Sequence, residues 1–342
     1  MIILTQRDVI ELLSMTDCID VMGRALGALT RGESILPLRT VLRLPNGKDF
    51  FAVMPAFVGS PDGIGAKIIT VFPGNHGTAL DSHQGAVLLL DAATGSVQAL
   101  LDASSITAIR TAAVSCLATR LLARKDADDL AILGSGVQAR SHLEAMAIVR
   151  PLRRIRVWSR DTARARALRH PPGHAEQREG SGAAAIPVIE VCGSAKEAVH
   201  GASIICTTTA SPEPVLRGEW IADGAHINAV GASSPKSREL DTAAIVRSTL
   251  FVDRRESALN ESGDVLMPIA EGAIMPNHIV AELGEVVTRS HRGRTSNTEV
   301  TVFKSLGLAV EDVAAAQFVH ARAVERSIGT VVDLGGARHG RP

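Results

Sequence analysis

Tyrosine is absent from this chain of 342 residues, and cysteine is sparse. The first absence removes the commonest phenolic acid or base from any catalytic mechanism. The four cysteines are widely separated and form no C-x-x-C pair, so they predict reduced, buried thiols rather than a disulfide framework or a zinc site. These residues are Cys18, Cys116, Cys192 and Cys206. We therefore expect a cytoplasmic protein, and we assign no residue to a metal.

An excess of one charge and long apolar runs are lacking as well. The 36 Lys and Arg residues balance 36 Asp and Glu residues, and no basic run is interleaved with aromatic residues. A nucleic-acid surface is therefore not expected. The apolar start is only a few residues long, and no later window reaches the roughly 18 uninterrupted apolar residues of a membrane span. We expect neither a signal peptide nor a membrane span, and the expected ligand is small.

The chain does contain enough apolar residues, 46%, for about two domains with sizeable cores. Its first hundred residues predict an α+β unit, in which two amphipathic helices precede a run of strands. Thr5 can cap the first helix, with Asp8 in the capping-box position, and Thr16 can cap the second. The helices are expected over 7–14 and 20–31, and the strands over 35–44, 49–54, 65–72, 85–91 and 96–101.

A long helix over 106–124, capped by Ser104 or Ser105, is expected to bridge to a second domain. Strands then alternate with helices, which predicts a doubly wound parallel sheet. These strands are expected over 129–133, 154–158, 186–191, 203–207, 226–230 and 250–252. A surface loop is predicted over 170–185, a last helix over 308–328 that packs back on the first domain, and a disordered tail over 335–342. The predicted domains are 1–120 with 313–342, and 121–312.

A glycine-rich turn joins the first strand of this alternating region to a helix. Four apolar residues of strand type lead into Gly134-Ser135-Gly136-Val137-Gln138-Ala139, and apolar residues follow at helical spacing. Gly134 permits the turn, Gly136 lets the backbone approach a pyrophosphate, and Ala139 allows close packing of helix and strand. The unpaired amides at the helix start would face the phosphates. This context favours a Rossmann-type dinucleotide site over a purely structural turn, with Val137 and Gln138 included in it.

The residues after the second strand indicate which dinucleotide binds. An NAD site has an acidic residue at this strand end, but here the strand ends in Trp158-Ser159-Arg160, with Arg164 nearby. Arg160 can pair with a ribose 2′-phosphate, so we predict NADP rather than NAD. The alternative is that both arginines are solvated charges at a helix start. Thr207 and Thr208, which end the fourth strand, can contact the nicotinamide ribose or phosphates, or serve turn chemistry alone.

Segments spread over nearly the whole chain resemble the ornithine cyclodeaminase and mu-crystallin family. Among them are Phe51-Ala52-Val53-Met54-Pro55-Ala56, Ser82-His83-Gln84, Ile106-Thr107-Ala108-Ile109-Arg110-Thr111-Ala112-Ala113, the glycine turn, Ala225 to Ser233, Glu261 to Leu266, Ala281 to Val286 and Thr301 to Gly307. So many collinear matches are specific for the family, which includes cyclodeaminases, amino-acid dehydrogenases and imine reductases. We add Thr111 and Val230, from two of these segments, to the predicted cofactor site.

The resemblance implies that Arg39, Lys67 and Arg110 form the substrate pocket and hold a carboxylate. Two planar guanidinium groups and a mobile ammonium suit such a ligand, although the sequence alone would favour surface or interdomain salt bridges for the arginines. Lys67 lies in an apolar run, where a charge must face a cleft or find a partner. We predict catalytic roles for Lys67, Arg110 and His83, the last as a donor to the substrate; a lone histidine is more often a packing or turn residue.

The resemblance implies that Ala52 and Ser233 stand where cyclodeaminases carry two acids. Their loss leaves no evident general base for amine chemistry, so a cationic pocket without carboxylates is expected to face the nicotinamide. The chain therefore reads closest to the mu-crystallin branch, which implies NADPH-dependent reduction of a cyclic ketimine carboxylate and a homodimer built through the first domain. The alternatives are an NAD-dependent cyclodeaminase that converts ornithine to proline and ammonia, and a non-catalytic NADP-dependent binding protein.

Overall fold

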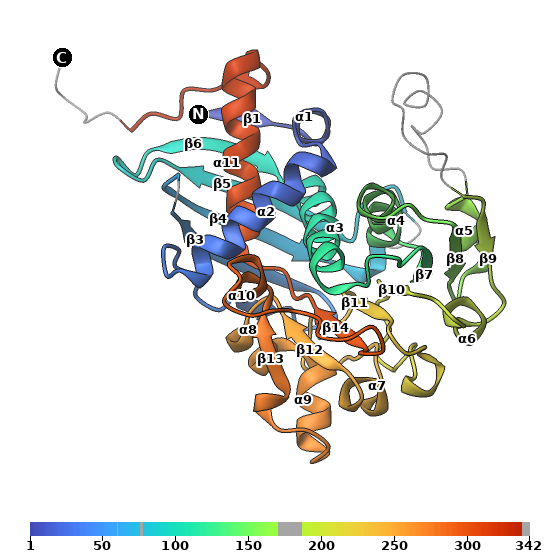
Figure 1. Ribbon diagram of the computed structural model, residues 1–342. Helices are drawn as coiled ribbons and strands as arrows, with labels where there is room; N and C mark the ends of the chain where they lie inside the picture. The colour runs from blue at the N-terminus through green and yellow to red at the C-terminus, as the bar shows by residue number, and fades with distance from the viewer. Residues whose placement is uncertain (60, 76–77, 170–186, 337–342) are drawn as a thin grey trace, which may run out of the picture. The chain divides into compact units, whose positions relative to one another are not determined.

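The computed structural model describes residues 1–59, 61–75, 78–169 and 187–336 (Figure 1). The chain divides into two compact units, Met1–Arg110 with Leu308–Pro342, and Thr111–Gly307. Each unit is built around its own sheet. The surface loop predicted over 170–185 and the tail from residue 337 lie outside the described residues.

The first unit contains a seven-stranded mixed sheet in the order β15-β1-β6-β5-β4-β3-β2. Its strands are β1 (Ile2–Leu4), β2 (Thr40–Arg43), β3 (Phe50–Val58), β4 (Gly63–Val71), β5 (His83–Leu90), β6 (Val97–Asp102) and β15 (Thr330–Val331). The predicted strand over 35–44 is too long, because only 40–43 is regular and Ile35 makes an isolated bridge to Phe57. Pro37 lies between these parts and has no N–H to donate to a strand ladder.

Alternation along β3 and β4 gives this sheet two different faces. On β4, Gly65, Lys67 and Ile69 are buried, whereas Ile64 and Ile68 are exposed. The last helix, α11 (Ala309–Arg326), packs on β3, β4 and β5 over the buried face and also contacts α2 (Met15–Thr30) (Figure 1). The prediction that the last helix returns to the first domain is confirmed.

Helix starts in this unit follow local side-chain chemistry. Thr5 and Asp8 form the predicted capping box of α1 (Gln6–Leu12). The other two predicted caps are wrong. Ser14, rather than Thr16, accepts the hydrogen bond from Asp17 that begins α2, and the Asp102 carboxylate accepts hydrogen bonds from both the amide and the hydroxyl of Ser105 at the start of α3 (Ala103–Leu122). In both cases an earlier side chain reaches the same orphan amides, so the helix begins sooner.

The second unit contains an eight-stranded sheet in the order β13-β12-β14-β11-β10-β7-β8-β9, and every pair is parallel. Its strands are β7 (Asp129–Leu133), β8 (Arg154–Trp158), β9 (Ile189–Val191), β10 (Ile204–Thr207), β11 (His226–Ala229), β12 (Thr249–Val252), β13 (Ile279–Glu282) and β14 (Thr301–Lys304). The predicted doubly wound parallel sheet, beside an α+β unit, is confirmed. Strands β13 and β14 are not among the predicted strands.

Short helices connect these strands. They are α4 (Val137–Val149), α5 (Thr162–Ala167), α6 (Ala195–Val199), α7 (Thr242–Val246), α8 (Arg255–Glu261), α9 (Gly263–Ala270) and α10 (Leu283–Val287). Single 3-10 turns occur at Pro73–Asn75, Gly218–Trp220 and Pro276–His278. Strand order reverses between β7 and β10, and such switch points are where ligands bind in open parallel sheets.

Among the described residues, α3 is the one helix long and apolar enough to meet the length and hydropathy criteria of a membrane span. Of its most apolar window, 72% is buried inside the protein. A core helix has this property, since apolar side chains at every position must then pack against protein.

Candidate functional site

The glycine turn follows β7 in the geometry that the sequence predicted. Gly134 has φ +133°, and its amide donates to the Trp158 carbonyl at 2.8 Å. A Cβ there would lie 2.5 Å from the Thr208 hydroxyl oxygen and 2.7 Å from the Thr208 carbonyl oxygen. Neither the backbone conformation nor the space allows a larger residue, so glycine is required at this position.

The start of α4 fits a pyrophosphate. Gly136 is the N-cap, and a Cβ on it would meet no atom within 4 Å, so open space lies before the first helical amides. Val137 is exposed, Gln138 is half-buried and Ala139 is completely buried. Arg140, one turn into the helix, has a buried Nη1 without a hydrogen-bond partner among the described residues. Orphan amides and a cationic donor at one helix start suit an anion.

The end of β8 lies beside this turn, because the hydroxyls of Ser135 and Ser159 are 2.8 Å apart. Arg160 is exposed. Arg164 is paired with Asp161 at 3.2 Å, and Asp161 also caps α5. The Asp161 carboxylate, which was not part of the prediction, partly compensates the charge of Arg164. Of the two arginines, Arg160 is the better candidate for a 2′-phosphate.

The predicted contacts at the other end of the cofactor need one correction. Thr207 is completely buried and its hydroxyl donates to Glu239 at 2.8 Å, so this hydroxyl does not face a ligand. The hydroxyl of Thr208 donates to the Leu133 carbonyl at 3.2 Å. Val230 and Thr111 are also buried. Thr207, Thr208 and Val230 lie where β10 and β11 end, as the alternative of turn chemistry allowed, whereas Thr111 lies inside α3.

Two glycine substitutions distinguish the structural role of Gly134 from the proposed phosphate-binding role of Gly136. We expect Gly134→Ala to destabilise the fold by about 1–3 kcal/mol, because of its positive φ and the contacts with Thr208. We expect Gly136→Ala to leave the melting temperature unchanged and to weaken NADPH binding by about tenfold or more, because its methyl group would enter the space meant for phosphate. Thermal unfolding and calorimetric titration measure both effects. Tight NADPH binding by a folded Gly136→Ala protein would contradict the phosphate assignment.

A buried ionic cluster forms in the first unit, on the face of the sheet that α11 covers. Lys67 Nζ lies 2.8 Å from Asp312 Oδ2, and the Lys67 side chain is 3% exposed. Arg110 Nε donates to Asp312 Oδ1 at 2.9 Å, and Arg110 Nη1 donates to Glu311 Oε2 at 2.9 Å. Lys67 also donates to the Thr107 hydroxyl at 3.5 Å. Strand β4 supplies Lys67, α3 supplies Arg110, and the first turn of α11 supplies both carboxylates.

Burial and neighbouring charges shift the pKa values of Lys67 and Asp312. Burial lowers the pKa of Lys67 to about 8; the charge of Asp312 opposes this change, and the guanidinium groups of Arg110 and Arg39 contribute to it. Burial alone would raise the pKa of Asp312, but Arg110 and Lys67 together hold it below its ordinary value. An ammonium with a pKa about one unit above neutrality can both hold and release a proton under ordinary conditions.

The expectation of a pocket without carboxylates is therefore wrong. Glu311 and Asp312 were missed because acids in the first turn of a helix are explained by the helix dipole alone. One signal pointed to them: both lie in Leu308-Ala309-Val310-Glu311-Asp312-Val313, an apolar segment in which two adjacent acids need buried partners. The sequence could not name those partners.

The other two predicted substrate residues differ in position. Arg39 is half-buried immediately before β2, and its charge acts on Lys67. His83 is exposed at the start of β5, where its Nδ1 lies 3.0 Å from the Ser82 hydroxyl. Its strand partner is Val71, four residues along β4 from Lys67. The structure thus brings Lys67, Arg110 and Arg39 into one electrostatic group.

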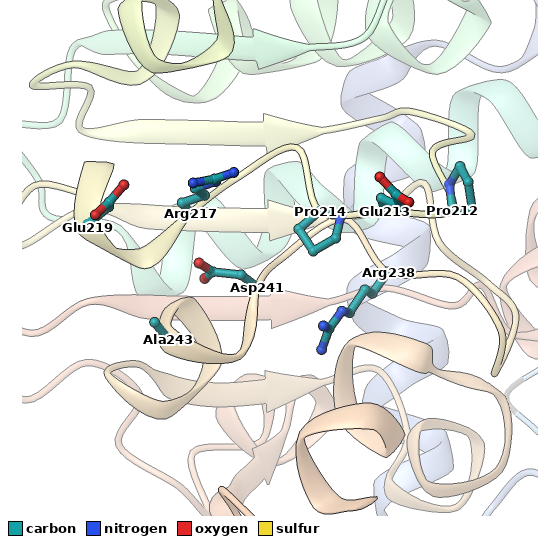
Figure 2. Close-up of a pocket in the computed structure, with 8 residues that line it drawn as sticks. All are labelled: Pro212, Glu213, Pro214, Arg217, Glu219, Arg238, Asp241 and Ala243. Carbon is teal, nitrogen blue, oxygen red and sulfur yellow. The ribbon is translucent and has the colours of Figure 1, made fainter. Parts of the chain in front are cut away.

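A separate cavity of about 590 Å³ lies in the second unit (Figure 2). Its charged lining residues are Glu213, Arg217, Glu219, Arg238 and Asp241. Arg238 is paired with Glu271 at 2.8 Å. None of the residues predicted from sequence lines this cavity, and its charges are of both signs, so we do not assign the substrate to it.

The parallel sheet and the glycine turn before α4 place the protein in the class of Rossmann-type dinucleotide-binding proteins. A sequence profile of the ornithine cyclodeaminase/mu-crystallin family matches residues 1–327, and the chain belongs to this family.

Relatives of known name cover most of the chain. The ketimine reductase mu-crystallin of Mus musculus is 44% identical over 289 residues, which is 84% of this chain and 85% of the relative. The Δ1-pyrroline-2-carboxylate reductase of Bacillus cereus is 35% identical over 98% of this chain and all of its own length. A solved structure of the Thermococcus litoralis Δ1-pyrroline-2-carboxylate reductase, in complex with NADH and L-proline, is similar with a TM-score of 0.91 and 36% identity, over 97% of this chain and 100% of the other.

Proposed function

We propose that this protein reduces cyclic ketimines that carry a carboxylate, of the pyrroline-2-carboxylate or piperideine-2-carboxylate type, with NADPH. Its class is that of NAD(P)-dependent imine reductases, to which the mouse, Bacillus and Thermococcus relatives belong by name. The observation that carries the proposal for the substrate is the buried Lys67, 2.8 Å from Asp312 and accompanied by two arginines. This group contains three cations and two carboxylates, Glu311 and Asp312, and a carboxylate on the substrate complements the excess of positive charge.

Reduction of a C=N bond requires a hydride on carbon and a proton on nitrogen. A bound nicotinamide supplies the hydride. We assign the proton to the Lys67 ammonium, whose lowered pKa favours release to an imine nitrogen, and Asp312 stabilises the ammonium beforehand. Arg39 and Arg110 orient the substrate carboxylate, and this orientation places the imine carbon correctly for hydride transfer. Neutral Lys67 then recovers its proton from solvent.

Substrate turnover tests the proposal directly. We expect purified protein to consume NADPH in proportion to added pyrroline-2-carboxylate or piperideine-2-carboxylate, as followed by the absorbance of the reduced nicotinamide. Ornithine should release no ammonia. Ammonia release with no net cofactor change would instead identify a cyclodeaminase. Tight NADPH binding without turnover of either imine would identify a binding protein.

The preference for NADP rests on Arg160. The Thermococcus relative is complexed with NADH, so the choice between the two cofactors is the point to test. We expect Arg160→Ala to weaken NADPH binding by about tenfold, because one charge-assisted contact to phosphate is lost, and to leave NADH binding unchanged. Arg153→Ala removes another exposed arginine, directly before the first residue of β8, and serves as the control. An unchanged ratio of the two affinities would refute the assignment.

We also propose a cytoplasmic homodimer built through the first unit. The sheet face opposite α11 exposes Ile64 by 38% and Ile68 by 37%, beside other apolar residues of β3 and β5. A continuous apolar face of this kind is typical of an interface. Sedimentation equilibrium tests the assembly: a mass of one chain would contradict it.

The proposed cytoplasmic location rests on the cysteines. All four are free and buried, which suits a reducing compartment.

A further inference from the structure

We propose that Glu239 is a positioning residue, whose carboxylate fixes the two loops that hold the nicotinamide half of the cofactor. The inference rests on the proposed function, since it deepens the same cofactor site. Glu239 is completely buried in the second unit. Its Oε2 accepts hydrogen bonds from the Thr207 hydroxyl at 2.8 Å and the Gly231 amide at 2.6 Å. Its Oε1 accepts from the amide and the hydroxyl of Thr209, at 2.6 and 2.7 Å.

The two loops joined by this carboxylate lie where a dinucleotide is expected. Thr207 is the last residue of β10, and Gly231 follows the end of β11. Strand β10 is the neighbour of β7 across the point where strand order reverses. The carboxyl ends of parallel strands at such a point form the binding crevice, and the strands beyond the reversal belong to the second mononucleotide half. With the pyrophosphate on α4, these loops face the nicotinamide half.

Close backbone contacts connect Glu239 to the glycine turn itself. A Cβ on Gly231 would lie 2.0 Å from the Thr209 carbonyl oxygen and 2.7 Å from Glu239 Oε1, so the two loops touch. The Thr208 amide donates to the Leu133 carbonyl at 2.8 Å, directly before the turn. A change at Glu239 therefore moves the loop that packs against Gly134, while the end of β8, where the adenosine half is expected, remains outside this group of contacts.

The carboxylate is in turn held by buried charges. Asp264 Oδ1 accepts hydrogen bonds from the backbone amides of Glu239 and Leu240, at 2.8 and 3.0 Å. Asp264 Oδ2 lies 2.9 Å from Lys304 Nζ, and neither side chain is exposed. Burial raises the pKa of Glu239, and the charge of Lys304 opposes this rise. No step of the proposed reaction uses Glu239, Asp264 or Lys304. We therefore explain these buried charges by their role in fixing the two loops.

Glu239→Gln tests this role with almost no change of volume. Both carboxylate oxygens accept from backbone amides, Gly231 on one side and Thr209 on the other. A glutamine must turn its NH₂ group toward one of these amides, so one donor faces another and one loop is released. We expect kcat to fall by about 10- to 100-fold, as for a small misplacement of reacting groups, and the KM for the imine to stay within about threefold.

Binding of cofactor fragments separates positioning from a general structural role. We expect the affinity for NADPH to fall by about tenfold in the glutamine variant, while the affinity for 2′,5′-ADP, which lacks the nicotinamide half, stays within about twofold. If the enzyme prefers NADH, then NADH and 5′-ADP are the probes. Equal losses for both ligands, or unchanged kcat and NADPH affinity in a folded variant, would overturn the inference. If the unmodified protein binds neither cofactor, it is the proposed function that fails.

A second variant covers the case in which Glu239→Gln does not fold. Thr207→Val is isosteric and removes a single hydrogen bond to Glu239, from a side chain with no exposed surface. We expect a three- to tenfold loss of kcat with unchanged 2′,5′-ADP binding, and normal kcat would contradict the proposal. Glu271→Gln is the matched control, because Glu271 is a partly exposed acid of the same unit that pairs with Arg238. Its kcat and affinities should equal those of the unmodified protein.

Discussion

Replacing Lys67 with methionine is expected to lower kcat for ketimine reduction by about 10²- to 10⁴-fold, the range associated with loss of a positioned general acid. Methionine fills a similar volume, so the sheet face under α11 stays packed. Lys67 is the buried ammonium of the cluster, and its pKa is lowered to about 8 mainly by burial. Steady-state NADPH consumption at saturating imine measures the loss.

The pH profile gives this variant a second, independent readout. The group must be protonated to donate, so in the unmodified protein kcat/KM for reduction falls as pH rises through about 8. In Lys67→Met this alkaline limb should disappear. Lys48→Met, at an exposed position in the turn between β2 and β3, is the control and should retain both rate and profile. A full rate with the same alkaline limb in Lys67→Met would assign the proton to His83 or to water.

Replacing Asp312 with asparagine is expected to have the largest effect on stability. The change leaves Lys67 and Arg110 buried with Glu311 as the remaining acid of the cluster. Removing one partner of a buried ion pair typically costs about 3–5 kcal/mol, because the remaining charge stays desolvated. For a chain of 342 residues, that free energy lowers the melting temperature by roughly 4–7 °C, because the entropy of unfolding is about 2.1 cal/mol/K per residue. Calorimetry or circular dichroism measures the shift.

The same substitution changes the titration of Lys67 in a defined direction. Asp312 is the group that raises the pKa of Lys67 against burial, so its loss should lower this pKa below about 8. The alkaline limb of kcat/KM then moves to lower pH, and kcat at neutral pH falls. Glu325→Gln removes an exposed acid from the same helix and serves as the control. An unchanged melting temperature together with an unmoved limb would show that Asp312 does not support Lys67.

Local patterns predicted the strands and the glycine turn of the candidate dinucleotide site well. The predicted strands over 129–133 and 154–158 match β7 and β8 residue for residue. Gly134 adopts the positive φ that the turn was expected to need. These features depend on neighbouring residues, since strand propensity, glycine conformation and helix amides act within a few positions of each other. The errors in this region were two four-residue strands and the role of Thr207.

The ionic cluster could not be predicted from local sequence patterns. Asp312 contacts Arg110 across 202 positions of sequence, and no periodicity relates the two. The sequence indicates that Lys67, a charge in an apolar run, needs a partner or a cleft. It does not indicate that this partner is Asp312 on the last helix. The resemblance to a family supplied Arg39, Lys67 and Arg110 as a set, and it left the two carboxylates unnoticed.

The sequence by itself determined the class of fold, the glycine turn and the membership of a nicotinamide-dependent family, because those depend on short-range chemistry and on collinear matches. Only the tertiary structure decided which charges meet: that Asp312, in the first turn of α11, pairs with both Lys67 and Arg110, and that Glu239 joins the loops after β10 and β11. The physical reason is that a buried charge is satisfied by whichever opposite group the packing of helices and strands brings within about 3 Å, and that choice is made by the whole fold.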